Sequence, residues 1–300
     1  MTLSVLIPVY NEDAQELVET VLQQISVLHL SAEVIIGDDH STEPMSWLRT
    51  VAAWPNVRVC LNARNLGRAA NRNSLVRMAQ GEWLLFLDSG NSITNPDFLG
   101  KYYEARNQAD IIVGGVCVSP AMRNEACLLR WEYEAAAAAT YQKALSSPIA
   151  IARWPFRSAA FLSSREVFNH VAFDDELKGY GYEDVLFGIE AQRQGFRIAH
   201  INAPVQLGQL EDNAVFLAKT EDAMQTLHRL RHRLTEPDAK NSCNIRLLSS
   251  VARIRQMHLT PFVRLGFRLT RGRLRRNLLS SHPSLRAFAL YKLGFYMMIE

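Results

Sequence analysis

The most informative segment of the chain is Trp83-Leu84-Leu85-Phe86-Leu87-Asp88-Ser89-Gly90-Asn91. Five apolar residues in a row are typical of a strand that is buried on both faces of a parallel sheet. The run ends at a carboxylate, a hydroxyl and a glycine. In open α/β sheets ligands bind just beyond the carboxyl ends of the strands, so Asp88 is expected at a functional site if this strand is central. The alternative is an ordinary polar junction between strand and loop, and the rest of the chain has to decide between the two.

The composition is that of a globular protein. The 300 residues are 48% hydrophobic and 21% charged, enough for one large domain or a main domain with an appendage. The apolar run 3–9 is too short for a signal peptide, and no uncharged run reaches membrane-spanning length. The absence of CxxC spacing favours plain buried thiols in a reducing, cytoplasmic setting for Cys60, Cys117, Cys127 and Cys243.

The net charge of +3 conceals an asymmetry along the chain. Residues 245–300 contain ten Arg and one Lys against a single Glu, a net charge of +10, whereas the residues before them contain 22 basic and 29 acidic side chains. We therefore expect a main domain over residues 1–235 and a basic, amphipathic helical extension over residues 236–300. A hinge between the two is predicted at Pro237, Asp238 and Asn241.

Strands alternate with helices in the first part of the chain. Asp13 followed by Glu16 predicts a capping box at the start of a helix, and Asn95-Pro96 predicts a cap followed by proline in the first turn. The alternation predicts an α/β fold with a Rossmann-like, mostly parallel sheet and helices on both faces. The expected strands are 3–9, 33–39, 57–61, 83–87 and 111–117, followed by a helical segment in 119–150, a short strand or turn at 161–162, and helices from 165, 183 and 213.

No glycine-rich phosphate loop is present. The turn after the first strand reads Val9-Tyr10-Asn11-Glu12, without GxGxxG, and GxxxxGK(S/T) occurs nowhere in the chain. Any bound phosphate would have to be neutralised by side chains or by a cation. The same turn argues against a nucleotidyltransferase, because such enzymes generally carry a glycine-rich, basic loop at this point.

A second chemical segment lies at residues 179–188, which read GYGYEDVLFG. The helix dipole alone favours acids in a first turn, so plain capping is one interpretation of Glu183 and Asp184. The other interpretation is ligand binding, because two Gly-Tyr pairs let the backbone and aromatic rings approach a ligand closely. Adjacent side chains on a helix point about 100° apart, so one acid can face a substrate while the other fixes a neighbouring group.

Five segments, each weak alone, occur in a specific order. They are IPVYNE at 7–12, DDHST at 38–42, NLGRAANRN at 65–73, LDS at 87–89 and the pair Glu183-Asp184. Over roughly residues 3–230 they resemble the family 2 glycosyltransferases, which are inverting enzymes of the GT-A fold that use nucleotide-diphospho-sugars. LRW at 129–131, FRS at 156–158 and the segment 179–188 look more narrowly like enzymes of bacterial surface-polysaccharide synthesis.

The resemblance implies a donor site at the ends of the first strands. Pro8, Tyr10 and Glu12 would line the nucleobase pocket, and Asp39 would accept a hydrogen bond from an imide N–H of the base. Uracil and thymine carry such an imide, so a UDP-sugar is the expected donor.

The resemblance also implies how the rest of the donor is held. Arg68 or Arg72 would meet the diphosphate, for which a guanidinium fork is well shaped. Asp88, with Ser89 beside it, would hold the ribose or a divalent cation, Mg²⁺ or Mn²⁺.

Catalysis is implied at the acidic pair. Asp184 would be the general base that takes the proton from the acceptor hydroxyl, and Glu183 would position the sugar or the acceptor. Arg157 and Tyr182 would contact the acceptor, a glycan or a lipid-linked molecule. Direct attack on the anomeric carbon would make this an inverting hexosyl- or N-acetylhexosaminyl-transferase.

The sequence departs from the family pattern at two positions that normally supply metal ligands. Gly90, followed by Asn91, stands where a second Asp is usual, and Gln206 stands where a His is expected after residues 202–205. One carboxylate can still hold Mg²⁺ with diphosphate oxygens and water. Alternatively, arginines replace the cation, because losing an acid beside a diphosphate removes about 1 to 4 kcal/mol of repulsion. The third alternative is a non-catalytic scaffold that binds nucleotide-sugars.

The basic extension has two interpretations. Arginines alternate with apolar residues at helical spacing, which suits a helix lying on an anionic membrane face, peripheral to the inner side of the cell membrane. The same pattern suits a helix that packs on the main domain with its arginines in water. Nucleic acid is not expected as a partner, because no recognised motif accompanies the charge. The residues are Arg264, Arg268, Arg271, Arg275 and Arg276 among Phe262, Leu265, Phe267, Leu269 and Leu274, with an aromatic end at Tyr291, Phe295, Tyr296, Met297 and Met298.

Overall fold

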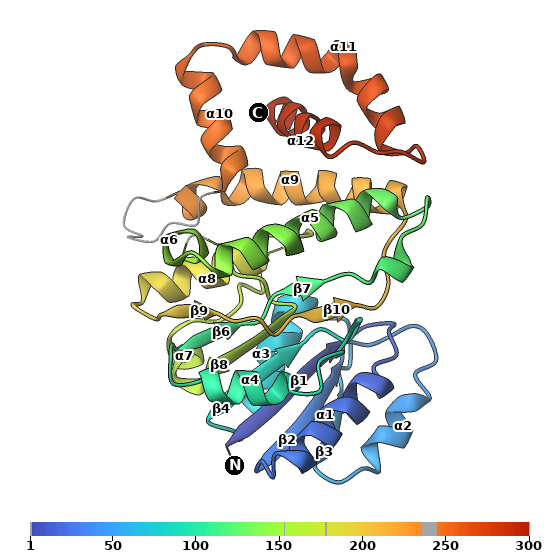
Figure 1. Cartoon of the computed structure of the whole chain (residues 1–300), viewed down its shortest axis with the longest axis vertical. Coiled ribbons are helices and arrows are strands. Elements are labelled where there is room, and N and C mark those ends of the chain that lie inside the picture. Colours follow the sequence, from blue (N-terminus) through green and yellow to red (C-terminus); the bar gives the residue numbers. More distant parts are fainter. Residues whose placement is uncertain (1, 153, 178, 236–244, 300) are drawn as a thin grey trace.

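A seven-stranded sheet is the central element of the protein (Figure 1). The computed structural model describes residues 2–152, 154–177, 179–235 and 245–299. The strands lie in the order β3-β2-β1-β4-β8-β6-β9, so the strand that ends at Asp88 is central. The predicted α/β fold with a mostly parallel sheet is confirmed. The bounds are β1 Leu3–Val9, β2 Ala32–Asp38, β3 Val57–Leu61, β4 Trp83–Leu87, β6 Ile111–Val113, β8 Ala160–Ser164 and β9 Ile198–His200.

Strand β8 interrupts the parallel pairing. β1 pairs in parallel with β2 and β4, and β2 with β3, whereas β8 runs antiparallel between β4 and β6. Phe86 of β4 pairs with Phe161 of β8, and their rings stack with centroids 4.6 Å apart. The segment predicted as a short strand or turn at 161–162 is therefore a full strand near the middle of the sheet.

Helices cover both faces of the sheet. Successive residues of a strand point to opposite faces, and accordingly Leu3, Val5 and Ile7 join one buried cluster while Leu6 joins the other. One face is covered by α1 (Gln15–Val27), α2 (Trp47–Ala52) and α4 (Phe98–Ala105), and the other by α3 (Arg68–Met78), α7 (Arg165–His170) and α8 (Glu183–Arg193).

Two predicted helix caps are wrong in detail. Asp13 Oδ1 accepts a hydrogen bond from the Gln15 N–H at 2.8 Å, and α1 begins at Gln15 without a side-chain cap. Asn95 Oδ1 accepts from the Asp97 N–H at 2.9 Å, and α4 begins only at Phe98. In both places the short polar side chain closes a local turn before the helix, which competes with capping.

The predicted strand 111–117 is two strands in different sheets. The chain leaves β6 at Val113, bends at Gly114-Gly115, and continues as β7 (Val116–Cys117). Gly115 has a φ of +87°, which glycine adopts without steric cost. The bend carries the chain into a small sheet of order β5-β10-β7, in which β5 is Asn91–Ser92 and β10 is Val205–Leu207.

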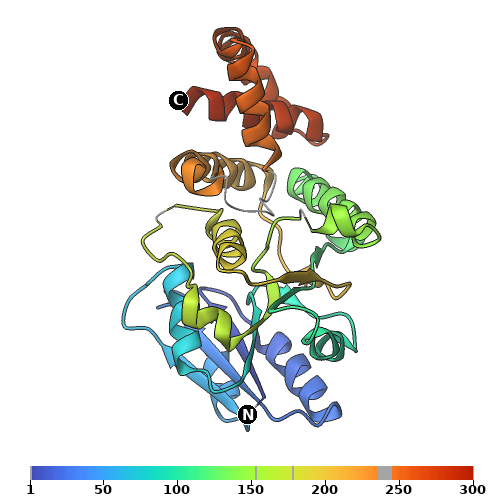
Figure 2. The same cartoon turned by 90° about the vertical axis from the view of Figure 1, so that its left-hand side faces the viewer.

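Helices form further layers on one side of the sheet (Figures 1 and 2). The layer nearer the sheet contains η1 (Pro120–Met122), α5 (Leu128–Leu145), α6 (Pro148–Ile151) and α9 (Asn213–Thr235). The layer beyond α9 contains α10 (Arg246–Gln256), α11 (Thr260–Leu278) and α12 (Leu285–Ile299).

The basic extension is helical and packs on the main domain. Tyr291, Tyr296 and Met297 of α12 are almost fully buried against α9 and its neighbours. Three of the five residues of the aromatic end that the sequence suggested as a membrane face are therefore core, whereas Met298 is exposed. The predicted hinge at Pro237, Asp238 and Asn241 lies outside the described residues, and the domain boundary after residue 235 stays a prediction.

Candidate active site

The predicted donor residues gather at one edge of the sheet. Val9 pairs with Asp38, and the Asp39 N–H donates to the Val9 carbonyl at 2.9 Å. Parallel neighbours end at a common edge, so the register of β1, β2 and β4 brings the residues that follow them together. On or just beyond this edge lie Pro8, Tyr10, Glu12, Asp39, Asp88 and Ser89.

Asp39 anchors the loop that leads into α3. Its Oδ1 accepts from the Leu66 N–H at 2.8 Å and from Asn62 Nδ2 at 3.0 Å, and its Oδ2 accepts from the Gly67 N–H at 2.8 Å. The side chain is buried. These hydrogen bonds use most of the acceptor capacity of the Asp39 carboxylate, so in this structure the side chain fixes the loop. Contact between Asp39 and a base stays a prediction.

Arg72 and Asp88 form an ion pair at the end of β4. Arg72 Nη2 lies 2.7 Å from Asp88 Oδ1, with the arginine 2% exposed and the aspartate 36% exposed. In the described part of the chain, Nε and Nη1 of Arg72 are buried without a hydrogen-bond partner. Buried donors are normally satisfied. A guanidinium with two unsatisfied donors is suited to receive a further anionic oxygen, as a phosphate would supply, once the side chains that cover these nitrogens move aside.

Arg68 joins the donor edge to the acidic pair. Its guanidinium carbon lies 5.2 Å from the centroid of the Tyr180 ring, against which Lys219 Nζ also lies at 5.4 Å. Burial lowers the pKa of Arg68, but nearby negative charge raises it by more, so the net shift is upward. The groups that raise it are Asp88 on the donor side, then Tyr180, and Glu183 of the acidic pair. The two predicted segments therefore lie around one guanidinium.

The pKa of Asp184 is raised above the ordinary value of an aspartate. Burial and the adjacent Glu183 carboxylate raise its pKa to about 6, while its hydrogen bond from the Val185 N–H, at 2.8 Å, and the charges of Arg157 and Arg72 lower it. A carboxylate is an efficient proton acceptor near neutral pH when its pKa is raised in this way.

The turn before the acidic pair is conformationally restricted. Tyr182 has a φ of +66° and lies in the left-handed region, and Gly181 before it has a φ of +85°. A Cβ on Gly181 would lie 3.1 Å from the Cβ of Ala223. A left-handed tyrosine is energetically costly, and such residues cluster at functional sites. This backbone fixes the direction from which α8 presents its first turn, whereas the acceptor role of Tyr182 stays a prediction.

Arg157 belongs to an ion network around a buried carboxylate, which was not predicted from the sequence. Its Nη1 and Nη2 lie 3.1 and 3.4 Å from the two oxygens of Glu134, and Arg130 Nη2 lies 3.0 Å from the same carboxylate. Glu134 is 2% exposed. Burial raises the pKa of Glu134, but the two arginines lower it by more. The i,i+4 spacing of Arg130 and Glu134 was the available signal.

Replacing Glu134 with Gln is expected to lower the free energy of unfolding by about 3 kcal/mol, because two arginines lose their buried carboxylate. Urea unfolding measures this. Glu132→Gln is the matched control: Glu132 is 36% exposed and pairs at 3.3 Å with an exposed Arg123, so its loss should cost less than about 1 kcal/mol. Equal effects of the two substitutions would contradict a stabilising network.

Glu12 and Ser89 are in direct contact. The Ser89 hydroxyl donates to Glu12 Oε2, and a Cβ on Gly90 would lie 2.9 Å from Glu12 Oε1. Gly90 therefore leaves the room in which the Glu12 carboxylate lies.

The two departures from the family pattern lie close together. β5 and β10 pair so that Gln206 is opposite Ser92, and the Gly208 N–H donates to the Gly90 carbonyl at 2.8 Å. Within the described ranges no group of three or more His, Cys, Asp or Glu side chains could hold a metal. In the same ranges Asp88 Oδ2 makes no hydrogen bond, so it fits a cation that takes its other ligands from a diphosphate and water.

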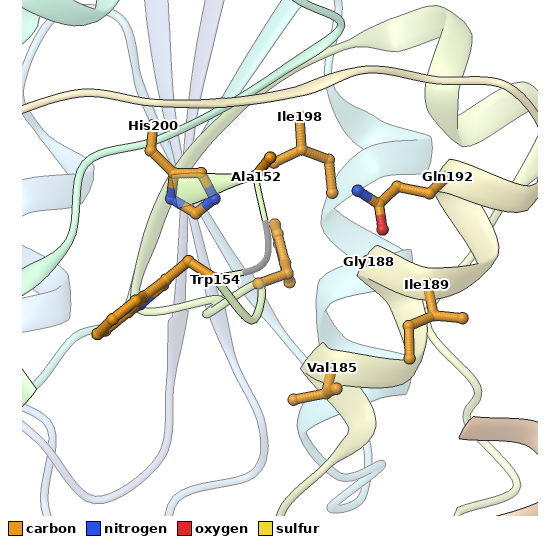
Figure 3. A pocket seen from close by; sticks show the side chains of 9 residues that line it. Ala152, Trp154, Val185, Gly188, Ile189, Gln192, Ile198 and His200 are labelled. Atoms are coloured by element: carbon orange, nitrogen blue, oxygen red, sulfur yellow. The ribbon is translucent and has the colours of Figure 1, made fainter. Parts of the chain in front are cut away.

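A small pocket adjoins the acidic pair without containing it. Figure 3 shows Trp154 and His200 across from the side chains of α8. Burial lowers the pKa of His200 to about 4, so its imidazole is neutral at physiological pH. No predicted site residue lines this pocket, which is formed by Ala152, Trp154, Phe156, Val185, Gly188, Ile189, Gln192, Ile198 and His200.

This sheet, with a carboxylate–arginine pair at its carboxyl edge and an acidic helix start facing it, places the protein in the GT-A fold class. The chain belongs to glycosyl transferase family 2, whose family model matches residues 4–163, just over half of its length.

Known proteins resemble the chain over different spans. It is 32% identical over 120 residues, 38% of its length, to the poly(ribitol-phosphate) beta-glucosyltransferase of Bacillus spizizenii. The chain covers less than a third of the length of the curated relatives that it matches, and 19% of this one.

Among solved structures, S. aureus TarS 1–349 in complex with UDP-GlcNAc has a TM-score of 0.53 at 18% identity, over 99% of this chain and 90% of that one. The mannosyltransferase PcManGT from Pyrobaculum calidifontis, in complex with GDP-Man and Mn²⁺, has a TM-score of 0.54 at 15% identity, over 99% and 84%. Identities this low establish a shared fold and no more.

Proposed function

We propose that the protein transfers a hexose or N-acetylhexosamine from a UDP-sugar to a hydroxyl of a glycan or lipid-linked acceptor, with inversion, in the synthesis of a surface polysaccharide. The observation that carries the proposal is a contact between the donor edge and the segment of the acidic pair. The guanidinium carbon of Arg68 lies 5.2 Å from the ring of Tyr180, a few residues before Asp184, and Arg72 Nη2 lies 2.7 Å from Asp88 Oδ1. These contacts support a single site that holds the diphosphate and accepts the proton.

In this mechanism Asp184 takes the proton of the acceptor hydroxyl as its oxygen bonds to the anomeric carbon. The bond from that carbon to the diphosphate breaks on the opposite side, so the configuration inverts. The leaving diphosphate gains negative charge. The unsatisfied donors of Arg72 and the guanidinium of Arg68, whose pKa is raised, stabilise that charge. Glu183 holds the sugar or acceptor, and Arg157 and Tyr182 contact the acceptor.

Uracil as the base is supported by TarS, which binds UDP-GlcNAc within the same fold. A polymeric acceptor is supported by the B. spizizenii relative, whose name gives poly(ribitol-phosphate). Pro8, Tyr10 and Glu12 would line the base pocket. A cytoplasmic reaction is proposed because Cys60, Cys117 and Cys127 are free thiols.

A divalent cation, Mg²⁺ or Mn²⁺, would be held by Asp88 Oδ2 and would supply positive charge to the diphosphate. We expect UDP to bind the purified protein in calorimetric titration with Mn²⁺, and at least about tenfold more weakly with excess EDTA. Equal binding in the two buffers would contradict the metal and favour arginines alone. If UDP binds in neither buffer, the assignment of a UDP-sugar as the donor is wrong.

The second candidate function is a non-catalytic scaffold that binds nucleotide-sugars. It is favoured by Gly90 and Gln206, which lie on neighbouring segments and supply neither of the two side chains, an aspartate and a histidine, that the family pattern places there. The raised pKa of Asp184 argues against it, because a scaffold gains nothing from a tuned base. UDP binding without release of UDP from any UDP-sugar in the presence of candidate acceptors would favour the scaffold.

A further inference from the structure

Helix α11 carries an apolar stripe on the side that faces away from the protein. Phe262, Leu265 and Leu269 are 71%, 57% and 74% exposed. Their spacing of three and four residues places them on one face of the helix. The opposite face, with Phe267 and Leu278, is buried against α12 and its neighbours. Apolar residues recur at helical spacing on both faces of α11, so only the packing in the fold shows which face is buried.

Arginines continue and flank this stripe. Arg273 and Arg276 lie on the same face one to two turns further along α11, since they follow Leu269 by four and seven residues. Arg268 and Arg275 lie along its edge. All four are exposed. Within the described ranges none of the four has a carboxylate at ion-pair distance.

The outer face of α11 lies at the end of the molecule opposite the sheet (Figures 1 and 2), where no other described element covers it. Met257 and Leu259, in the turn between α10 and α11, are also exposed. Among the described residues, no helix has both the length and the apolar character needed to cross a bilayer.

We infer that this face of α11 docks on the surface of an anionic bilayer, with its apolar stripe at the level of the acyl chains and its arginines among the headgroups. A helix with a narrow apolar face and flanking arginines is the form that interfacial helices take, and arginine stems can bury while their guanidinium groups stay in water. A second copy of the chain fits less well, because two such faces would bring their unpaired arginines together.

Docking through α11 has a consequence for the acceptor, which rests on the proposed function. α12 and α9 lie between α11 and the active-site helix α8 (Figure 1). With packed helices about 8–10 Å apart, the site stands on the order of 20 Å or more from the membrane surface. The acceptor hydroxyl then belongs to a chain that projects from the membrane, and not to the first sugar on a lipid.

Vesicle sedimentation of the full chain tests the docking without any need for transfer activity. We expect the protein to sediment with phosphatidylcholine vesicles that contain about one third phosphatidylglycerol, weakly with phosphatidylcholine alone, and less at 0.5 M than at about 0.1 M salt. Changing Arg268, Arg273 and Arg276 to Gln should weaken binding about 100-fold. The matched control changes the exposed Arg49, Arg77 and Lys143 to Gln and should have little effect.

The apolar stripe is tested in the same assay. Phe262→Ser, Leu265→Ser and Leu269→Ser together should weaken binding at least about tenfold, whereas Ser at the equally exposed Val27, Leu61 and Ile149 should not. Point variants are preferable to truncation, because removal of α12 would uncover the apolar side of α9. The inference is overturned if the wild type does not sediment with anionic vesicles, if stripe and control variants bind equally, or if the stripe variant instead turns a dimer into a monomer.

Discussion

Replacing Asp184 with Asn is expected to lower the rate of sugar transfer by about 10³-fold, while UDP binding stays within about twofold of wild type. The amide has the shape of the carboxylate and keeps the acceptor for the Val185 N–H, but it cannot take a proton. Single-turnover transfer and calorimetric titration of UDP measure the two effects separately. Retention of full activity would remove Asp184 as the base.

The same variant should be at least as stable as the wild type. A carboxyl whose folded pKa is raised binds more protons in the folded than in the unfolded state, so stability is lost as pH rises from the unfolded to the folded pKa. Asp184, raised to about 6, is therefore a destabilising charge at pH 7, and Asn removes it. Thermal unfolding at pH 7 should show an unchanged or higher Tm. A lower Tm would mean that the loss of activity could come from misfolding.

The pH profile gives this prediction a further readout. Only the ionised carboxylate accepts a proton, so wild-type transfer should rise with pH through about 6 and level off above it. Glu190→Gln is the matched control: Glu190 lies on the same helix and pairs at 3.0 Å with Arg193, away from the first turn. It should keep both the rate and the profile. A profile without an inflection near 6 in the wild type would contradict the assignment.

The donor edge could be predicted from the sequence because its geometry follows from local signals. Apolar runs that end at Asp39 and Asp88 mark strand ends, and parallel strands meet at one edge. The position of β8 could not be predicted in this way. The pattern of its five residues does not say whether the strand lies at the edge or in the centre of the sheet, or whether it runs parallel or antiparallel to its neighbours. Its partners are chosen by aromatic packing between segments far apart in the chain, such as Phe86 and Phe161.

Ion pairs between residues far apart in the sequence were the hardest feature to predict. Glu134 was missed because its partner Arg157 is far away in sequence and meets it only when α5 packs over the sheet. In the extension, helical spacing indicated an amphipathic helix but did not say which side was covered. Phe267 and Leu269 look alike in the sequence, yet Phe267 is buried and Leu269 is exposed. Burial is a property of the assembled layers, and so the membrane face could be defined only after the fold was known.

Replacing Arg72 with Met is expected to weaken UDP binding by about 10² to 10³-fold. The guanidinium is 2% exposed, and two of its donors have no partner in the described part of the chain. If those donors bind the diphosphate, their removal deletes a buried, charge-assisted fork, a loss of about 3 to 4 kcal/mol. Arg72→Lys keeps the charge but not the fork and should fall between Met and wild type.

The fold should tolerate Arg72→Met, which separates binding from stability. Asp88, the partner left behind, is 36% exposed and can be hydrated, and methionine is flexible enough to fill the space beside Phe173. Arg165→Met is the matched control, because Arg165 also has a buried nitrogen without a described partner and bonds the Gly81 carbonyl at 2.8 Å, before the start of β4 and thus at the other edge of the sheet. It should leave UDP affinity unchanged. If both variants lose UDP binding equally, or if Arg72→Met binds UDP as the wild type does, the unsatisfied donors of Arg72 are not a diphosphate site.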